Sequence, residues 1–509
     1  MTRRRDPEAL VTLRSLGRLG LVALSTTLYA LTLQWVYVNL ITVPFGYAGY
    51  SYHPGPWQAT VLTVAMTAVV AAALPPRLAR VSHVVLWILF SVCVAPAMLM
   101  VNYTGYVSIE HGLLTSATIG GGILVAAIGT RLLDARAASL AASEAAAAAA
   151  SASTSTESAV ETAEPAPALA PTPAPARPGA LGTISALRRR LPSGSIMWAV
   201  VAVHSLVTYA LLTATVGLSL RFIALDDVYD VRAVYADEAS SSGLLGYLLS
   251  GQANVINTMI IVRGLMKRNW TLLIVGVAGQ MVLFSGTGFK TILFSFPAVL
   301  LVGLLMRRRT PRSGLWLVIG SVALMAASAV ADEVQGGLTW TSLFSRRFLI
   351  TPGLLTSVYA DFFSQNPVAQ LSGSVLRWWV GNPYDQSIPR EVGQYLLPGS
   401  QLAANANLFA DGLANFGPAG VIGVGALLLA FLRVVDRASR GLPVAVGAMV
   451  MVMPSVTLSN TSLLTAMLSH GLAVGVLLLW TAPRDGWGRV PTPQPATAEN
   501  VEAGRGRLT

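Results

Sequence analysis

The chain has 509 residues, of which 54% are hydrophobic and only 11% are charged, and its mean hydropathy is +0.62. A soluble globular domain carries about 25% charged residues, so this composition excludes most soluble folds and indicates a protein embedded in lipid. The formal net charge is +11, and the single cysteine, Cys93, excludes an intramolecular disulfide and a cysteine metal cluster.

Twelve segments are apolar enough to cross a bilayer, whose hydrocarbon core needs about 20 such residues per helix. They are 19–41, 57–75, 82–102, 112–130, 195–218, 244–262, 270–286, 291–306, 314–331, 417–432, 442–458 and 462–480. The first segment is too long for a signal peptide and lacks a small-residue cleavage site, so we expect an anchor. The predicted fold class is an all-α polytopic membrane protein with about 12 transmembrane helices and both termini on one side.

The basic residues test this topology, because cytoplasmic loops carry an excess of Lys and Arg. The segments assigned to the cytoplasm are 1–18, 76–81, 131–194, 263–269, 307–313, 433–441 and 481–509. They hold 27 of the 34 basic residues and have a net charge of +16, whereas the other side has −5. Only seven basic residues remain outside: Arg221, Arg232, Lys290, Arg346, Arg347, Arg377 and Arg390. The net charge therefore indicates orientation in the cytoplasmic membrane, with cytoplasmic termini, and not nucleic-acid binding.

A change in composition divides the chain into two membrane parts. Residues 135–194 are rich in Ala, Ser, Thr and Pro, and they predict a disordered cytoplasmic linker with weak helical tendency before its prolines. The linker separates a four-helix membrane segment, 1–134, from an eight-helix membrane core, 195–480. A cytoplasmic tail, 481–509, follows.

Two predicted outer loops are long. The first, Arg221 to Gly243, contains Asp226-Asp227, which fit a solvated loop. The second, residues 333–416, holds four of the seven outer basic residues, and its many aromatic side chains argue for order. Loops longer than about 12–15 residues are usually functional or disordered. Aromatic rings beside carboxylates and arginines suit a sugar, whose apolar faces pack on rings while its hydroxyls need polar partners.

Several sequence pieces occur in order over about residues 195–480. They are Tyr229-Asp230-Val231-Arg232, Gly288-Phe289-Lys290-Thr291, Arg346-Arg347-Phe348 with Pro352-Gly353, Tyr359-Ala360-Asp361-Phe362-Phe363 with Asn366-Pro367, and Asn405-Ala406-Asn407-Leu408-Phe409-Ala410-Asp411 with Ala414-Asn415-Phe416-Gly417. In this order they resemble the Wzy-type oligosaccharide repeat-unit polymerases. The resemblance implies a GT-C-like integral membrane glycosyltransferase that needs neither a metal nor another cofactor.

Such an enzyme would transfer a polyprenyl-diphosphate-linked oligosaccharide onto another lipid-linked repeat unit at the outer face of the cytoplasmic membrane. The implied partners are this donor and acceptor, membrane lipids and other polysaccharide-assembly proteins, with no nucleic acid. Without a metal, the charge on the leaving diphosphate must be balanced by Arg or Lys. The acceptor hydroxyl needs a base within hydrogen-bond reach.

The outer residues of the right chemistry form the candidate site. The candidate bases are Asp361, Asp411 and Asp230, and the candidate substrate- and diphosphate-binding residues are Arg232, Lys290, Arg346, Arg347, Arg377, Tyr359 and Asn405. Structural alternatives stand beside these roles: Arg346 and Arg347 would contact lipid phosphates, Lys290 would snorkel, and Asp411 would cap a helix.

Three rival functions remain open. An O-antigen-ligase-like enzyme would use a loop histidine, which residues 333–416 lack. A GT-C arabinosyl- or mannosyltransferase would carry an acidic pair in its first outer loop, but Pro44 to Pro56 contains no Asp or Glu. A transporter of lipid-linked oligosaccharides would show inverted repeats, broken helices and charges at mid-membrane. The sequence has no clear repeat, and its predicted spans are nearly free of charged residues.

Overall fold

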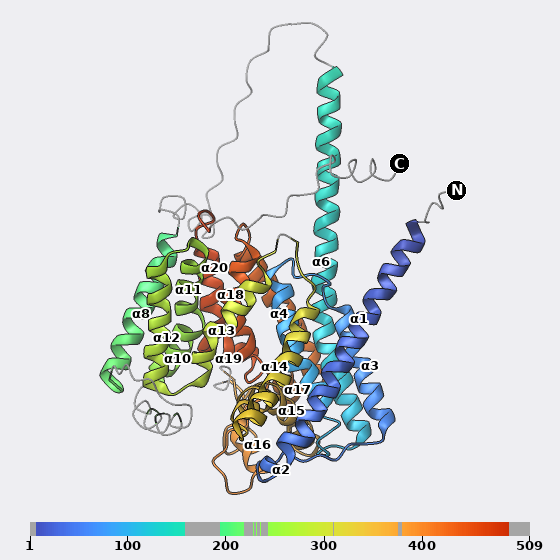
Figure 1. The fold of residues 1–509 in the computed structure, drawn as a ribbon, viewed down its shortest axis with the longest axis vertical. Coiled ribbons are helices and arrows are strands. Elements are labelled where there is room, and N and C mark those ends of the chain that lie inside the picture. Colours follow the sequence, from blue (N-terminus) through green and yellow to red (C-terminus); the bar gives the residue numbers. More distant parts are fainter. Residues whose placement is uncertain are drawn as a thin grey trace.

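The fold is known from a computed structural model, which describes residues 7–157, 194–217, 228, 231, 235, 243–308, 310–374 and 379–487. These residues are predominantly helical and contain no β-strand (Figure 1). Eight of their helical segments are long and apolar enough to cross a membrane, or nine if one bent pair counts as a span. Three further apolar helices are shorter. This architecture fits a polytopic membrane protein, as predicted, whereas the total of twelve spans stays a prediction.

The N-terminal part surrounds a deeply buried helical segment. Its elements are α1 (Pro7–Val36), η1 (Tyr37–Ile41), α2 (Thr42–Phe45), η2 (Gly46–Ala48), α3 (Trp57–Ala73), α4 (Val81–Leu89), η3 (Phe90–Val94), α5 (Ala95–Met100) and α6 (Ile109–Glu157). The segment Val81–Met100 is 94% buried. Apart from Ser82, His83 and Ser91 it is apolar, which is typical of a helix packed inside a bundle.

The second part continues the bundle and includes the long predicted loop. Its elements are α8 (Ser195–Thr215), α10 (Gly243–Gly251), η5 (Gln252–Ile256), α11 (Asn257–Lys267), α12 (Trp270–Thr287), α13 (Lys290–Leu305), α14 (Leu315–Gln335), η6 (Thr341–Ile350), α15 (Thr351–Gln365), α16 (Ile388–Leu396), α17 (Leu408–Ala438), α18 (Val444–Thr457), α19 (Leu463–Ser469) and α20 (Leu472–Thr481). Residues 333–416 therefore contain the helices η6, α15 and α16 and the start of α17, and these parts of the long predicted loop are ordered.

The predicted linker begins as a helix and not as a disordered chain. Helix α6 runs without interruption to Glu157, so residues 135–157 differ from the predicted disorder. Alanine has the highest helix propensity, and the run from Ala145 to Ala150 extends a helix that is already nucleated in the membrane segment. The rest of the predicted linker, residues 158–193, lies outside the described residues.

One predicted span is bent, and another helix is kinked where its predicted span begins. The predicted span 462–480 is bent by 62° between α19 and α20. The bend falls at Gly471, whose φ of +86° lies in the left-handed region that glycine adopts most readily. Helix α17 is kinked at Phe416 and Gly417, directly before Pro418. The kink separates the first turns of α17 from the apolar stretch predicted to span.

The four-helix segment packs tightly against the core through α6 and α17. A Cβ atom placed on Gly425 of α17 would lie 2.0 Å from the carbonyl oxygen of Gly122 on α6. Small residues allow such close approach of two helix backbones, which gains van der Waals contact where lipid supplies no hydrophobic drive. The N-terminal helices are therefore part of the same helix bundle that carries the predicted site.

The segments predicted to be cytoplasmic meet at one end of the bundle, which we call the basic end. The backbone N–H of Leu78 donates to the carbonyl of Arg312 at 2.9 Å, and Arg80 pairs with Asp134 at 2.8 Å. The guanidinium of Arg263 donates to the carbonyl of residue 486 at 3.0 Å. The start of α1 and the far end of α6 lie toward this end (Figure 1). The segments are thus grouped as predicted, while the side of the membrane that they face stays a prediction.

Candidate functional site

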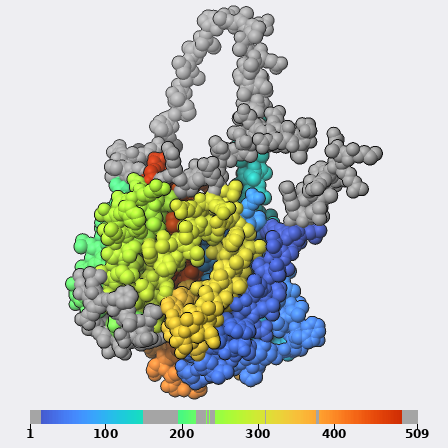
Figure 2. Space-filling view, in the orientation of Figure 1, coloured from blue at the N-terminus to red at the C-terminus, as the bar shows by residue number. Residues whose placement is uncertain are grey.

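The opposite end of the bundle carries four of the ten candidate site residues, which are Arg346, Arg347, Tyr359 and Asp361. It comprises residues 42–56, residues 101–108, η6, α15 and α16, and we call it the aromatic end because tyrosines and phenylalanines predominate there. These elements lie at the bottom of Figure 1. In the space-filling view the orange segment around α16 lies against the blue N-terminal helices at the lower edge (Figure 2). Both halves of the chain therefore contribute to this end.

The π-helix η6 is held in place by a buried carboxylate. Asp332 accepts the backbone N–H groups of Trp340 and Thr341, at 2.8 and 2.6 Å, and so satisfies two donors at the start of η6. One turn further on, the guanidinium of Arg346 donates to the hydroxyl of Ser342, with Nε at 3.0 Å and Nη2 at 2.6 Å. The Arg346 side chain therefore has a fixed direction.

Arg346 points toward rings supplied by the N-terminal helices. Its Cζ lies 4.1 Å from the ring centroid of Phe45 and 5.8 Å from that of Tyr50, and such cation–π contacts favour a fixed guanidinium. The Tyr50 hydroxyl lies 2.7 Å from Thr351 Oγ1, which donates to the carbonyl of Arg346. Arg347 is exposed. We call Ser342, Arg346, Phe45 and Tyr50 the arginine subsite.

A carboxylate subsite lies on α15 and α16. The Tyr395 hydroxyl donates to Asp361 Oδ2 at 2.6 Å, and Gln365 Nε2 donates to Oδ1 at 3.0 Å. The hydrogen bond to Asp361, together with burial, raises the pKa of Tyr395, so the tyrosine stays a donor. Phe362 packs against Tyr395 with ring centroids 5.4 Å apart. Asp361, Gln365, Tyr395 and Phe362 make up the carboxylate subsite.

The two subsites are joined by a close contact at Gly49. The Tyr106 hydroxyl donates to the carbonyl of Gly49 at 2.8 Å. A Cβ on Gly49 would lie 2.5 Å from Leu396 Cδ1, and the φ of +86° there also favours glycine. Gly49 precedes Tyr50 of the arginine subsite, and Leu396 follows Tyr395 of the carboxylate subsite. The arginine and carboxylate subsites therefore lie at the same end of the bundle and are linked through this contact.

Asp411 does not act as the helix cap that the sequence left open. Asn407 caps α17, because its Oδ1 accepts the backbone N–H groups of Phe409 and Ala410, each at 3.0 Å. Its Nδ2 donates to Thr356 on α15 at 2.7 Å, which ties the two helices together. Asp411 follows in the first turn of α17, partly buried, and its role as a base stays a prediction.

Two candidate binding residues differ in exposure. Tyr359 is only 1% exposed, and its hydroxyl donates to the carbonyl of Ala404 at 2.8 Å, so its oxygen is engaged in holding the chain before α17. Asn405, the next residue, is exposed and open to a ligand. The arrangement favours Asn405 over Tyr359 as a group that contacts substrate.

Lys290 lies on an element that packs against η6. It opens α13, and Phe294, one turn later, packs edge-on against Phe344 of η6 with ring centroids 4.8 Å apart. Phe344 is two residues before Arg346. Three further candidates, Asp230, Arg232 and Arg377, lie outside the described residues.

The sequence prediction missed the contribution of the N-terminal helices. Phe45, Tyr50 and Tyr106 face the predicted arginine and aspartate, although the segment that carries them matched no motif. A signal was present: residues 45–56 contain one phenylalanine, three tyrosines and three glycines, which is typical of a packed, aromatic turn and not of a plain connection.

The aromatic end combines three kinds of chemical group. It offers a fixed guanidinium for an anion, a carboxylate held by a tyrosine for a hydroxyl proton, and rings for a pyranose or furanose face. In the described part of the chain, no three His, Cys, Asp or Glu side chains are grouped as metal ligands would be. No protein family, curated protein or solved structure matches the chain.

Proposed function

We propose that the protein is a membrane glycan polymerase. It transfers a polyprenyl-diphosphate-linked oligosaccharide onto a second lipid-linked repeat unit at the outer face of the cytoplasmic membrane. The observation that carries the proposal is the presence, at one end of the bundle, of the arginine subsite and the carboxylate subsite, linked through Gly49 and surrounded by aromatic rings from both halves of the chain. The ordered sequence pieces that resemble Wzy-type polymerases support the same function.

The proposed reaction uses these groups in a balanced way. Asp361 accepts the proton of the acceptor hydroxyl while the hydroxyl oxygen bonds to the anomeric carbon of the donor sugar. The bond from that carbon to the diphosphate oxygen breaks, and the electron pair leaves with the polyprenyl diphosphate. Arg346 and Arg347 balance the charge that develops there. Tyr395 holds the Asp361 carboxylate toward the acceptor.

Deletion of the gene in the organism that encodes this chain tests the proposal without knowledge of the sugar. We expect the deletion strain to lack long surface glycan and to retain single repeat units on the lipid carrier in the outer leaflet. Wild-type protein restores the ladder of chain lengths, which a gel of extracted glycan measures. An accumulation of long chains on the lipid carrier indicates a ligase and would contradict the proposal.

A lipid-linked oligosaccharide transporter is the second candidate, and one observation favours it. Transporters bind substrate at interrupted helices, and the pair α19 and α20 is bent by 62°. In that case the deletion strain would keep its single repeat units in the inner leaflet. Leaflet-specific digestion of the lipid-linked sugar in right-side-out vesicles separates the two functions.

A further inference from the structure

A second site lies at the basic end, outside the proposed catalytic region. A cavity of about 450 Å³ opens there between α4, α6, α17 and the start of α18. Its charged lining consists of Arg80, Asp134, Arg433, Asp436, Arg437 and Arg440. Four guanidinium groups and two carboxylates leave the lining positively charged.

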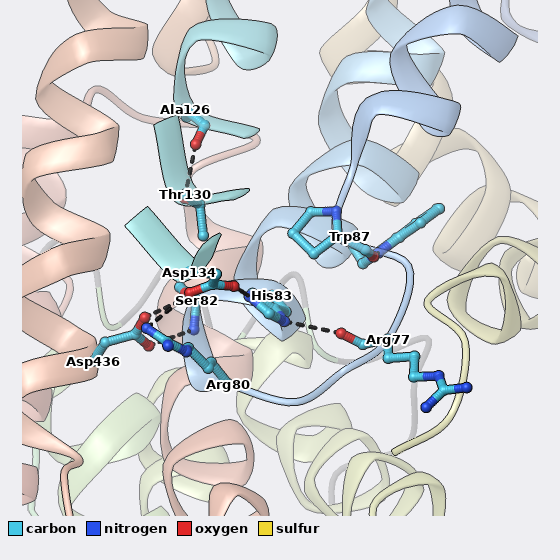
Figure 3. Close-up of polar contacts among 10 residues, drawn as sticks. Arg77, Arg80, Ser82, His83, Trp87, Ala126, Thr130, Asp134 and Asp436 are labelled. Atoms are coloured by element: carbon cyan, nitrogen blue, oxygen red, sulfur yellow. Dashed lines mark hydrogen bonds and ion pairs between the residues drawn. The ribbon is translucent and has the colours of Figure 1, made fainter. Parts of the chain in front are cut away.

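Both carboxylates already have partners within the protein (Figure 3). Asp134 pairs with Arg80 at 2.8 Å and contacts His83 Nε2 at 2.8 Å. Asp436 accepts from the backbone N–H of Ser82 at 3.0 Å and from its hydroxyl at 2.7 Å, which caps the start of α4. These contacts fix the walls of the cavity, and they engage both carboxylates with groups other than Arg433, Arg437 and Arg440.

Three arginines remain at the end of α17 and in the turn that follows it. Arg433 and Arg437 are spaced i, i+4 and therefore share one face of α17, while Arg440 lies in the turn after its last residue, Ala438. All three are exposed, and within the described ranges no hydrogen bond or ion pair engages their guanidinium groups. A row of arginines without carboxylate partners, beside a preformed cavity, has the chemistry of an anion site.

Two helix N-termini beside the cavity also favour binding of an anion. Helices α4 and α18 both begin at its wall, with Val81 and Val444 among the lining residues. The N-terminus of a helix carries partial positive charge and free N–H donors. Asp436 occupies the start of α4, whereas Pro443 at the N-cap of α18 supplies no side-chain acceptor.

We propose that this cavity binds a phosphate group, with Arg433, Arg437 and Arg440 as its ligands. The position at the end of apolar helices makes an anionic phospholipid headgroup one source, since basic pockets between helices bind such headgroups. A soluble phosphate compound is the other source. The chemistry of recognition is the same in both cases.

Thermal unfolding of the purified full-length protein tests the site, because a ligand that binds the folded state raises the unfolding temperature. Wild-type protein in neutral-lipid nanodiscs is titrated with cardiolipin, phosphatidylglycerol or inorganic pyrophosphate. The triple variant Arg433→Gln, Arg437→Gln, Arg440→Gln is compared with Arg268→Gln, Arg307→Gln, Arg308→Gln, which removes three exposed arginines from the same end.

We expect a saturable rise in unfolding temperature for wild type and for the control variant that lacks Arg268, Arg307 and Arg308. The variant that lacks Arg433, Arg437 and Arg440 should need at least tenfold more ligand for the same rise. The single variant Arg437→Glu should also need more ligand than wild type. A response to the lipids alone identifies a headgroup, and a response to pyrophosphate identifies a soluble phosphate. An equal loss in both triples, or no saturable rise with any probe, would overturn the proposal.

Discussion

The two ends of this helix bundle both carry arginines, but the surroundings of these arginines differ. At the basic end, arginines are numerous, and three of them line a cavity without carboxylate partners in the described part of the chain. At the aromatic end, basic residues are few, and Arg346 is fixed by Ser342 and stacked on Phe45. Both ends therefore hold candidate anion ligands, but the arginines of the basic end are exposed beside a cavity, whereas Arg346 is immobilised by its neighbours.

The comparison also shows which contacts connect the halves of the chain. At the basic end, Ser82 and Asp436 join the N-terminal segment to α17 through hydrogen bonds. At the aromatic end, the two halves meet at Gly49, where the absence of a side chain leaves room for Leu396 and Tyr106. We expect substitutions at the first junction to affect stability and substitutions at the second to affect both stability and chain extension.

The largest effect is expected at the carboxylate subsite. Asp361→Asn removes the proposed base while keeping its shape, and general bases contribute about 10²–10⁴-fold to a rate. We expect chain extension in reconstituted membranes to fall by about that factor. Asp385→Asn, an exposed carboxylate at the same end, is the matched control and should extend chains normally. Equal activity of the two variants would remove Asp361 from the site.

The next effect is expected at the arginine subsite. Arg346→Gln keeps a polar side chain but removes the charge that balances the leaving diphosphate, and loss of one such group costs about 10²–10³-fold in rate. The same extension assay, run beside Arg390→Gln on the exposed face of α16, measures it. If Arg390→Gln extends chains as slowly as Arg346→Gln, the loss of rate comes from the overall positive charge at this end and not from the arginine subsite.

A smaller effect is expected where the subsites join. Gly49→Ala places a Cβ 2.5 Å from Leu396, and overpacking of this kind costs about 1–3 kcal/mol. Gly336 also has a positive φ, +73° compared with +86° at Gly49, but a Cβ there would have no neighbour within 4 Å. Gly336→Ala therefore adds only the strain of a left-handed backbone and no steric clash. The unfolding temperature in detergent should be lower for Gly49→Ala than for Gly336→Ala. The reverse ranking would mean that α16 does not dock on residue 49.

The smallest effect is expected at the basic end. Ser82→Ala removes the hydroxyl that donates to Asp436 at 2.7 Å, and a hydrogen bond to a charged group is worth about 1.5–3 kcal/mol. The backbone N–H of residue 82 still reaches Asp436, so the loss should be near the lower limit. Chain extension per folded molecule should match that of wild type, and a specific loss of extension would show that the ends do not act separately.

Much of the helical architecture was predictable because apolar length and basic-residue placement both follow from the physics of the bilayer. The sequence could not show that Phe45 and Tyr50 face Arg346, since that contact joins residues about 300 positions apart. Nor could it show the bend at Gly471, because hydropathy does not report backbone direction. Composition alone does not predict the helix at residues 135–157, because there the high helix propensity of alanine extends a helix that is already nucleated in the membrane segment.

Sidedness decides whether the aromatic end can reach a lipid-linked glycan outside the cytoplasm. The only cysteine, Cys93, is fully buried, so a single introduced cysteine reports its own position to a membrane-impermeant maleimide. In right-side-out vesicles, Asp385→Cys at the aromatic end should be labelled at once, and Arg308→Cys at the basic end only after permeabilisation. The opposite pattern would place Asp361 and Arg346 in the cytoplasm and contradict the proposed polymerase.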